Sequence, residues 1–245
     1  MQSLKFWSLF ALALPAAVRT RRTAVRAEGA AGSDTGTVGD GPSLKLVGLG
    51  DSIIAGVGAS THAVGLVGRT AESLAGLEDV QVEWTAIGRS GATSAAIRER
   101  LLPTAPLAAA DAVIVSAGVN DLTRLHGPTR FQRDLEALLD AIERAAPRAR
   151  IALAGLPPLE TFPALPPALK RAFGLRGRQL DGVMQQVAAK RSRVAHAAVE
   201  IDAAAAADRA SFSADGFHPS ETSYVPFGRG MAETLHRLAR PATCG

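Results

Sequence analysis

The chain has 245 residues, of which 47% are hydrophobic and 20% charged, which fits one α/β domain with a sizeable core and a short leader. Aromatic residues make up only 4%, so that core must be built largely from Ala, Leu and Val. The formal net charge is +4, but several arginines lie in the leader, and no clustered basic face with stacking aromatics indicates a nucleic-acid partner. The single cysteine, Cys244, excludes an internal disulfide.

Residues 1–26 form the leader. Lys5 precedes an apolar run over 6–14, and small residues follow at 15–17. This order is typical of an export signal with a weak cleavage site, and the alternative is a poorly ordered, Arg-rich tail. The run is shorter than the roughly 20 apolar residues of a spanning helix, so no stable membrane span is expected. If residues 1–17 act as a signal, the protein is periplasmic or secreted, and otherwise it is cytoplasmic.

A Gly-rich segment of small residues over 27–43 predicts a flexible linker, and the domain itself is expected over 44–240. Within the domain, apolar β-rich runs alternate with helical patterns, which favours a parallel sheet covered by helices on both faces. The runs expected to be strands are 44–49, 80–87, 112–117, 150–154 and 194–201. Helices are expected over 62–76, 131–145, 168–191 and 222–239.

The proline-rich segment 156–167 cannot be a regular helix or a central strand, because proline lacks a backbone donor and blocks helix continuation. It follows a predicted strand, so it should run over the ligand side of the sheet. Its apolar members Leu159, Phe162 and Leu165 are candidates for a pocket wall. A plain surface connector is the competing interpretation.

Ser52 stands at the end of the first strand, within Gly50-Asp51-Ser52, where open α/β sheets place their ligand crevices. The stretch lacks the third Gly of a dinucleotide fingerprint, the Lys of a phosphate-binding loop and the Gly-x-Ser-x-Gly nucleophile elbow. Two interpretations of Ser52 are left, a helix cap and a nucleophile.

Other predicted strand ends also carry polar residues, and in a parallel sheet these ends meet at one rim. His218 can take the proton of a serine hydroxyl, and Asp215, three residues earlier, can fix the imidazole tautomer. The backbone N–H groups of Ser52 and Gly91 and the side-chain amide of Asn120 are candidates for an oxyanion hole. This set of residue types predicts acyl transfer.

Four blocks of the chain resemble the motifs of the SGNH hydrolase superfamily, also called GDSL-type esterases and lipases. They are, in the family's order, Gly50-Asp51-Ser52-Ile53, Ser90-Gly91-Ala92-Thr93, Gly118-Val119-Asn120-Asp121 and Asp215-Gly216-Phe217-His218-Pro219, with Ile53 in place of the family's Leu. The resemblance implies a flavodoxin-like, three-layer α/β/α fold with a five-stranded parallel sheet in order 2-1-3-4-5. It also implies a catalytic triad of Ser52, Asp215 and His218, and an oxyanion hole formed by Ser52, Gly91 and Asn120.

The function that follows is hydrolysis of carboxylic esters, of a small molecule, lipid or sugar, through an acyl-enzyme and without a metal or organic cofactor. An acyltransferase or a carbohydrate-ester deacetylase on the same site is the alternative, and a non-catalytic binding module is a third hypothesis. Asp51 and Asp121 are expected to support the loops that carry Ser52 and Asn120. The other histidines lack zinc-ligand spacing, and His196 is expected to be a packed or edge histidine.

Overall fold

The computed structural model describes residues 2–23, 28–199, 201, 204 and 208–239. Some residues of the expected segments lie outside the described residues. They are 24–26 of the leader, 27 of the linker, 200 of the last strand and 240 at the end of the domain, and Cys244 also lies outside.

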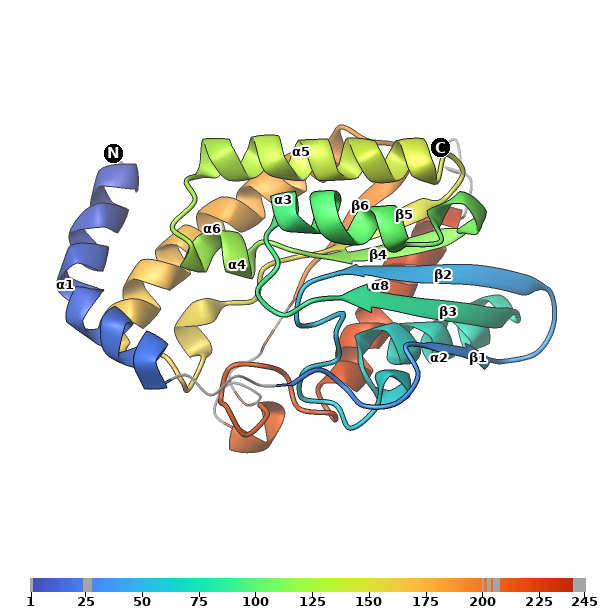
Figure 1. The fold of residues 1–245 in the computed structure, drawn as a ribbon, viewed down its shortest axis with the longest axis horizontal. Helices are drawn as coiled ribbons and strands as arrows, with labels where there is room; N and C mark the ends of the chain where they lie inside the picture. Colours follow the sequence, from blue (N-terminus) through green and yellow to red (C-terminus); the bar gives the residue numbers. More distant parts are fainter. Residues whose placement is uncertain (1, 24–27, 200, 202–203, 205–207, 240–245) are drawn as a thin grey trace.

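A six-stranded sheet forms the centre of the domain (Figure 1). Five of its strands are parallel and lie in the spatial order β3-β2-β4-β5-β6, which is the predicted order 2-1-3-4-5. These strands are β2 (Ser43–Gly50), β3 (Gln81–Gly88), β4 (Ala112–Ser116), β5 (Arg150–Ala154) and β6 (Val194–Ala197).

The sixth strand, β1 (Thr35–Val38), corrects two expectations. The sheet has six strands rather than five, and part of the expected flexible linker 27–43 is an edge strand. β1 pairs antiparallel with β3 and places Gly36 opposite Trp84. A Cβ at position 36 would collide with the indole ring, so this glycine makes room for the buried Trp84 side chain under the edge strand.

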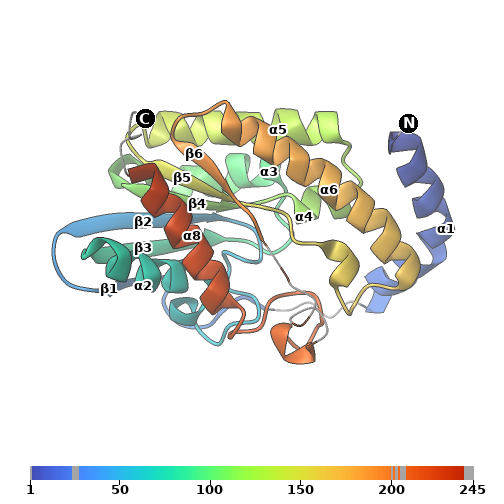
Figure 2. The ribbon, with the colours of Figure 1, turned by 180° about the vertical axis from the view of Figure 1, so that it is seen from behind.

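Helices cover both faces of the sheet, in the predicted three-layer α/β/α arrangement (Figures 1 and 2). On one face α2 (Leu66–Glu78) and α8 (Tyr224–Ala239) pack together, and Gly228 of α8 lies so close to Arg69 of α2 that a Cβ would not fit. On the other face lie α5 (Pro128–Ala145) and α6 (Pro167–Ala189). The short helical elements are η1 (His62–Val64), α3 (Ser94–Ala96), the π-helical turn η2 (Ile97–Leu101), η3 (Leu102–Thr104), η4 (Leu107–Ala109), α4 (Val119–Thr123), η5 (Leu159–Thr161) and η6 (Arg209–Ser211).

Successive strand residues face the two helical layers in turn, as the two-residue period of a β-strand requires. In β4, Val113 and Val115 belong to the core under α5 and α6, whereas Ala112 and Ile114 belong to the core under α2 and α8. All five residues of β4 are buried, which explains why this strand is continuously apolar in the sequence.

The expected leader contains a helix, α1 (Gln2–Thr23), which packs along α6. Phe6 is fully buried, and Phe10 stacks on Phe173 with ring centroids 6.3 Å apart. The guanidinium carbon of the buried Arg176 lies 3.9 Å from the centre of the Phe6 ring, a cation–π contact. Export and cleavage of this segment stay predictions. Within the described residues, no helix combines the length and the apolar character needed to cross a membrane.

The buried tyrosine at the start of α8 connects this helix to the loop after β2. The hydroxyl of Tyr224 donates a hydrogen bond of 2.6 Å to the carbonyl oxygen of Val57, and both residues are fully buried. Tyr224→Phe leaves that carbonyl without its donor, so we expect the free energy of unfolding to fall by about 1–3 kcal/mol, measured by urea denaturation.

The matched control is Thr234→Val on the same helix. The hydroxyl of Thr234 is also buried, but it donates to Gly230 O within the helix, where the carbonyl keeps its backbone partner. A loss for Tyr224→Phe no larger than for Thr234→Val would contradict the proposed connection.

Candidate active site

Ser52 lies in the first turn after β2, at the carboxyl end of the sheet. Gly50 ends the strand, and a Cβ there would collide with the backbone of Ser116 on the neighbouring strand. The chain then forms a tight turn, in which Asp51 O accepts a hydrogen bond from Ala55 N at 3.0 Å and Ser52 O accepts one from Val57 N at 3.0 Å. This turn holds the largely buried Ser52 at the rim of the sheet.

His218 and Asp215 reach Ser52 from a loop that precedes α8. Ser213 N donates to His218 O at 2.8 Å and closes this loop. Nε2 of His218 lies 3.0 Å from Oγ of Ser52, and Nδ1 of His218 lies 2.6 Å from Oδ2 of Asp215. The structure therefore brings these three predicted site residues into one hydrogen-bonded series, across a separation of 166 residues.

The second oxygen of Asp215 accepts three further hydrogen bonds, from the Ser213 hydroxyl at 2.7 Å, Phe217 N at 2.8 Å and His218 N at 3.0 Å. Burial alone would raise the pKa of Asp215, but the hydrogen bonds from His218, Ser213 and Phe217 outweigh it and hold the pKa well below its usual range. The carboxylate therefore stays ionised and favours the tautomer in which Nδ1–H of His218 donates to it. Nε2 is then left to accept from the Ser52 hydroxyl.

Asp51 is the buried carboxylate next to the nucleophile candidate. Its Oδ1 accepts from Ser116 Oγ at 2.9 Å and from Ile53 N at 3.1 Å, so it joins the Ser52 turn to the end of β4 as expected. Burial raises the pKa of Asp51 from 3.8 to about 6, and the hydrogen bonds from Ile53 and Ser116 only partly offset this.

Gly91 lies in the loop after β3 and Asn120 lies in the short helix α4, and hydrogen bonds connect the two segments. The side-chain amide of Asn120 donates to Ala92 O at 3.0 Å, and Gly91 has a positive φ of 80°, which glycine adopts without strain. Asp121 Oδ2 accepts from Ser94 N at 3.0 Å and Ser94 Oγ at 3.1 Å. The buried Asp121 was expected to support the segment that carries Asn120, and these bonds also connect that segment to the one after Gly91. The assignment of Gly91 and Asn120 to an oxyanion hole stays a prediction.

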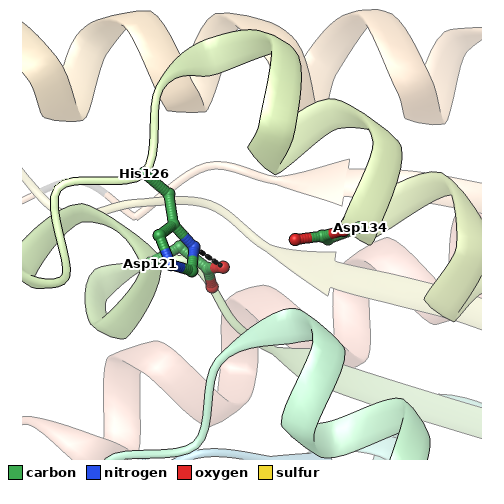
Figure 3. A group of neighbouring side chains, drawn as sticks. All are labelled: Asp121, His126 and Asp134. Atoms are coloured by element: carbon green, nitrogen blue, oxygen red, sulfur yellow. Dashed lines mark hydrogen bonds and ion pairs between the residues drawn. The ribbon is translucent and has the colours of Figure 1, made fainter.

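Asp121 also belongs to a buried group with His126 and Asp134 whose potential ligand atoms lie within 4.8 Å of one another (Figure 3). Asp121 Oδ1 lies 3.0 Å from His126 Nδ1, and Asp134 lies apart from this pair on α5, with its carboxylate 2.8 Å from the Arg133 guanidinium. Protein donors thus engage both oxygens of Asp121 and Oδ1 of Asp134. Oδ2 of Asp134 is buried without a hydrogen-bond partner among the described residues, and it lies 3.6 Å from Nε of Arg130.

A cavity of about 420 Å³ opens beside Ser52 and His218. One face of α8 lines it through Pro226, Phe227, Gly230 and Met231, which recur at helical spacing, and Ser223 lines it just before the helix. Other apolar lining residues come from the ends of β4, β5 and β6 and from the segment before α8, among them Val119, Leu156, Val199, Phe212 and Phe217. The active-site rim therefore borders a largely apolar space.

The segment 156–167 is irregular apart from η5, as its prolines require, but only one of its three candidate wall residues was predicted correctly. Phe162 lines the cavity. Leu159 and Leu165 instead are buried in the core under α5 and α6. The turn of η5 directs Leu159 towards α6, where it approaches Gly177.

Several residues of the site were missed by sequence reasoning. Ser116 and Ser213 are short polar residues next to predicted strand or motif ends, and their positions in the sequence gave the only available signal. His196 was predicted correctly as an edge histidine: it lies on the outer parallel strand β6 and pairs with Asp181 at 2.8 Å.

The raised pKa of Asp51 predicts that the free energy of unfolding falls as pH rises. The folded protein binds this proton more tightly than the unfolded chain does, so the stabilisation is complete below pH 3.8 and is lost as pH rises through about 6. Relative to Asp51→Asn, the wild type should lose on the order of 3 kcal/mol of unfolding free energy between about pH 4 and about pH 8.

Urea denaturation of both proteins across this range measures the difference. Asp40→Asn, at an exposed loop carboxylate, is the control. A wild-type-minus-variant difference that does not change with pH for Asp51→Asn would show that burial does not destabilise the ionised form of Asp51.

Comparisons with known proteins identify the family and the fold of this chain. The model of the GDSL-like lipase/acylhydrolase family matches residues 49–225, more than half of the chain. A search of curated proteins gives no match. Among solved structures, TesA has 24% identity and a TM-score of 0.60, covering 79% of this chain and 99% of its own. A lipase/acylhydrolase from Enterococcus faecalis has 22% identity and a TM-score of 0.59, covering 82% and 100%.

A family 3 carbohydrate esterase from Clostridium thermocellum shares the fold at 20% identity and a TM-score of 0.58, covering 81% of this chain and 100% of its own. These likenesses confirm the fold, and the family match extends from the strand before Ser52 to the start of α8. The chain is an ester hydrolase that belongs to the GDSL-like lipase/acylhydrolase family, and so to the SGNH hydrolase superfamily.

Proposed function

We propose that this protein hydrolyses carboxylic esters of apolar acyl groups through an acyl-enzyme on Ser52. The observation that carries the proposal is the hydrogen-bonded series Ser52–His218–Asp215 at the mouth of an apolar cavity. His218 Nε2 accepts the hydroxyl proton as Ser52 Oγ attacks the acyl carbon. Asp215, held ionised by its four hydrogen bonds, stabilises the imidazolium that forms.

The negative charge that develops on the acyl oxygen needs donors that are in place before the reaction. We assign this role to the backbone N–H groups of Ser52 and Gly91 and to the side-chain amide of Asn120. The bond from Asn120 to Ala92 O fixes the orientation of that amide, which has two N–H donors, and Asp121 holds the loop beneath it. His218 then gives the proton to the leaving alcohol. Water next attacks the acyl carbon as His218 takes its proton, and His218 passes that proton to Ser52 Oγ as the bond to the acyl group breaks and the acid leaves.

The cavity favours an acyl chain over a sugar as the group that it accommodates. Phe162 contacts Phe212 and Phe217 edge to face, with ring centroids 5.5 Å and 5.2 Å apart, and Phe217 in turn lies 5.4 Å from the His218 ring. These rings and the face of α8 provide apolar surface, which is suited to an alkyl chain. We therefore propose a lipase- or lysophospholipase-like substrate, with the acyl chain lying along α8.

Replacement of the nucleophile tests the reaction itself. Ser52→Ala should lower kcat/KM for a p-nitrophenyl ester by at least about 10³, because no other group takes over the covalent step. Ser90→Ala, at an exposed serine on the neighbouring loop, is the matched control and should retain wild-type activity. Turnover by purified Ser52→Ala at more than a small fraction of the wild-type rate would exclude the assignment. Release of free acid in step with the alcohol distinguishes hydrolysis from acyl transfer.

A change in the depth of the cavity tests the substrate class. Gly230 lines the cavity, and a side chain there meets no atom within 4 Å of its Cβ. Gly230→Leu should therefore shorten the space, lowering kcat/KM roughly tenfold or more for long-chain p-nitrophenyl esters and little for the acetate.

Gly182→Leu is the matched control, because Gly182 is also a helical glycine with open space around its Cβ but lies on α6 and does not line the cavity. An equal loss for short and long esters in Gly230→Leu would contradict the proposed path of the acyl chain while leaving the role of Ser52 intact.

A further inference from the structure

We propose that α1 is an interfacial helix that docks the protein on an anionic lipid surface. The first observation is the concentration of exposed apolar side chains on this helix. Of the six large hydrophobic residues that are exposed within the described part of the chain, four lie on α1. They are Trp7 (47% exposed), Leu12 (80%), Leu14 (50%) and Val18 (43%).

The second observation is the arrangement of these residues. Trp7, Leu14 and Val18 are separated by seven and four positions, so they form one stripe along the helix. Phe6, Phe10 and Ala13 form a different stripe, and this one packs towards α6. The helix therefore has one apolar face that the fold covers and another that faces outwards.

The third observation is charge. Residues 2–23 contain Lys5, Arg19, Arg21 and Arg22 and no acidic residue. A helix with exposed Trp and Leu and with basic residues is the type that lies in the membrane interface, where each basic residue is attracted to anionic headgroups. A second copy of the same helix is a poorer partner, because two segments that carry basic but no acidic residues would repel each other.

The fourth observation is the place of α1 in the fold. The contact between the Arg176 guanidinium and the Phe6 ring, together with the Phe10–Phe173 stack, attaches α1 firmly to α6. Figures 1 and 2 show α1 outside α6, at the end of the long axis towards which the parallel strands point. Docking through α1 would thus bring the active-site end of the domain close to the lipid. Although α1 has 22 residues, it is not apolar enough to span the bilayer, so we propose that it lies on the surface.

Sedimentation with vesicles tests the proposal on the full chain. The protein should bind vesicles of phosphatidylglycerol and phosphatidylcholine in equal parts at least tenfold more strongly than pure phosphatidylcholine vesicles, and salt should weaken this binding. Leu14→Gln/Val18→Gln should weaken binding to the anionic vesicles at least tenfold. Leu77→Gln, at an exposed leucine on α2 (44% exposed), should not. Unchanged hydrolysis of a soluble short-chain ester shows that each variant is folded.

Tryptophan fluorescence gives an independent readout, since the chain has two tryptophans and Trp84 is buried. Anionic vesicles should shift the emission to shorter wavelength in the wild type, and Trp7→Phe should remove the shift. Equal binding to neutral and anionic vesicles, no binding, or no effect of the double substitution would overturn the proposal. So would a dimer in solution that the double substitution dissociates, or an intact mass showing cleavage after residues 15–17.

Discussion

The hydrogen bond between Ser52 and His218 is the interaction on which the functional account depends, because it joins two parts of the chain that are 166 residues apart. One partner is held by the turn after β2 and the other by the loop before α8. Tyr224 donates to Val57 O and so connects the helix after the second partner to the turn that carries the first. The geometry of the site therefore depends on how α8 packs against the sheet and α2.

Two carboxylates lie near this hydrogen bond, and their environments shift their pKa values in opposite directions. Asp215 accepts four hydrogen bonds, which hold its pKa below the usual range, whereas burial raises the pKa of Asp51 to about 6. Opposed environments of this kind separate the roles of neighbouring acids. Asp215 is suited to stay charged and to orient His218. Asp51 accepts hydrogen bonds from Ser116 and Ile53, and these bonds help to shape the turn that carries Ser52.

Much of this arrangement could be predicted from the sequence, because its signals are local and regular. The alternation of apolar runs and helical patterns predicted the five parallel strands and the layers, and the motif blocks predicted which strand ends come together. β1 could not be predicted in this way: it is a four-residue strand in a Gly-rich segment, and it forms because Gly36 lies opposite Trp84. The same limit applies to Leu159, since the direction of its side chain is set by the turn of η5 and by the gap at Gly177 of α6.

The cavity was the least predictable part of the site. The residues of α8 that line the cavity recur at helical spacing. In a sequence this pattern indicates only that one side of a helix is apolar, and a helix packed on a core has the same pattern. Whether the face meets side chains or an open space depends on the loops opposite it, here the segments that carry Phe162 and Phe212. Substrate choice in this fold thus follows from loop packing, while the chemistry follows from the strand ends.

Covalent labelling with a fluorophosphonate probe tests the central claim most directly, because the probe reacts with a serine that an adjacent imidazole activates. The account predicts a single adduct per chain, located by peptide mapping at Ser52, and a much slower reaction in Asp215→Asn, where His218 loses its ionised partner. No adduct, an adduct at another serine, or labelling of Asp215→Asn at the wild-type rate would contradict it.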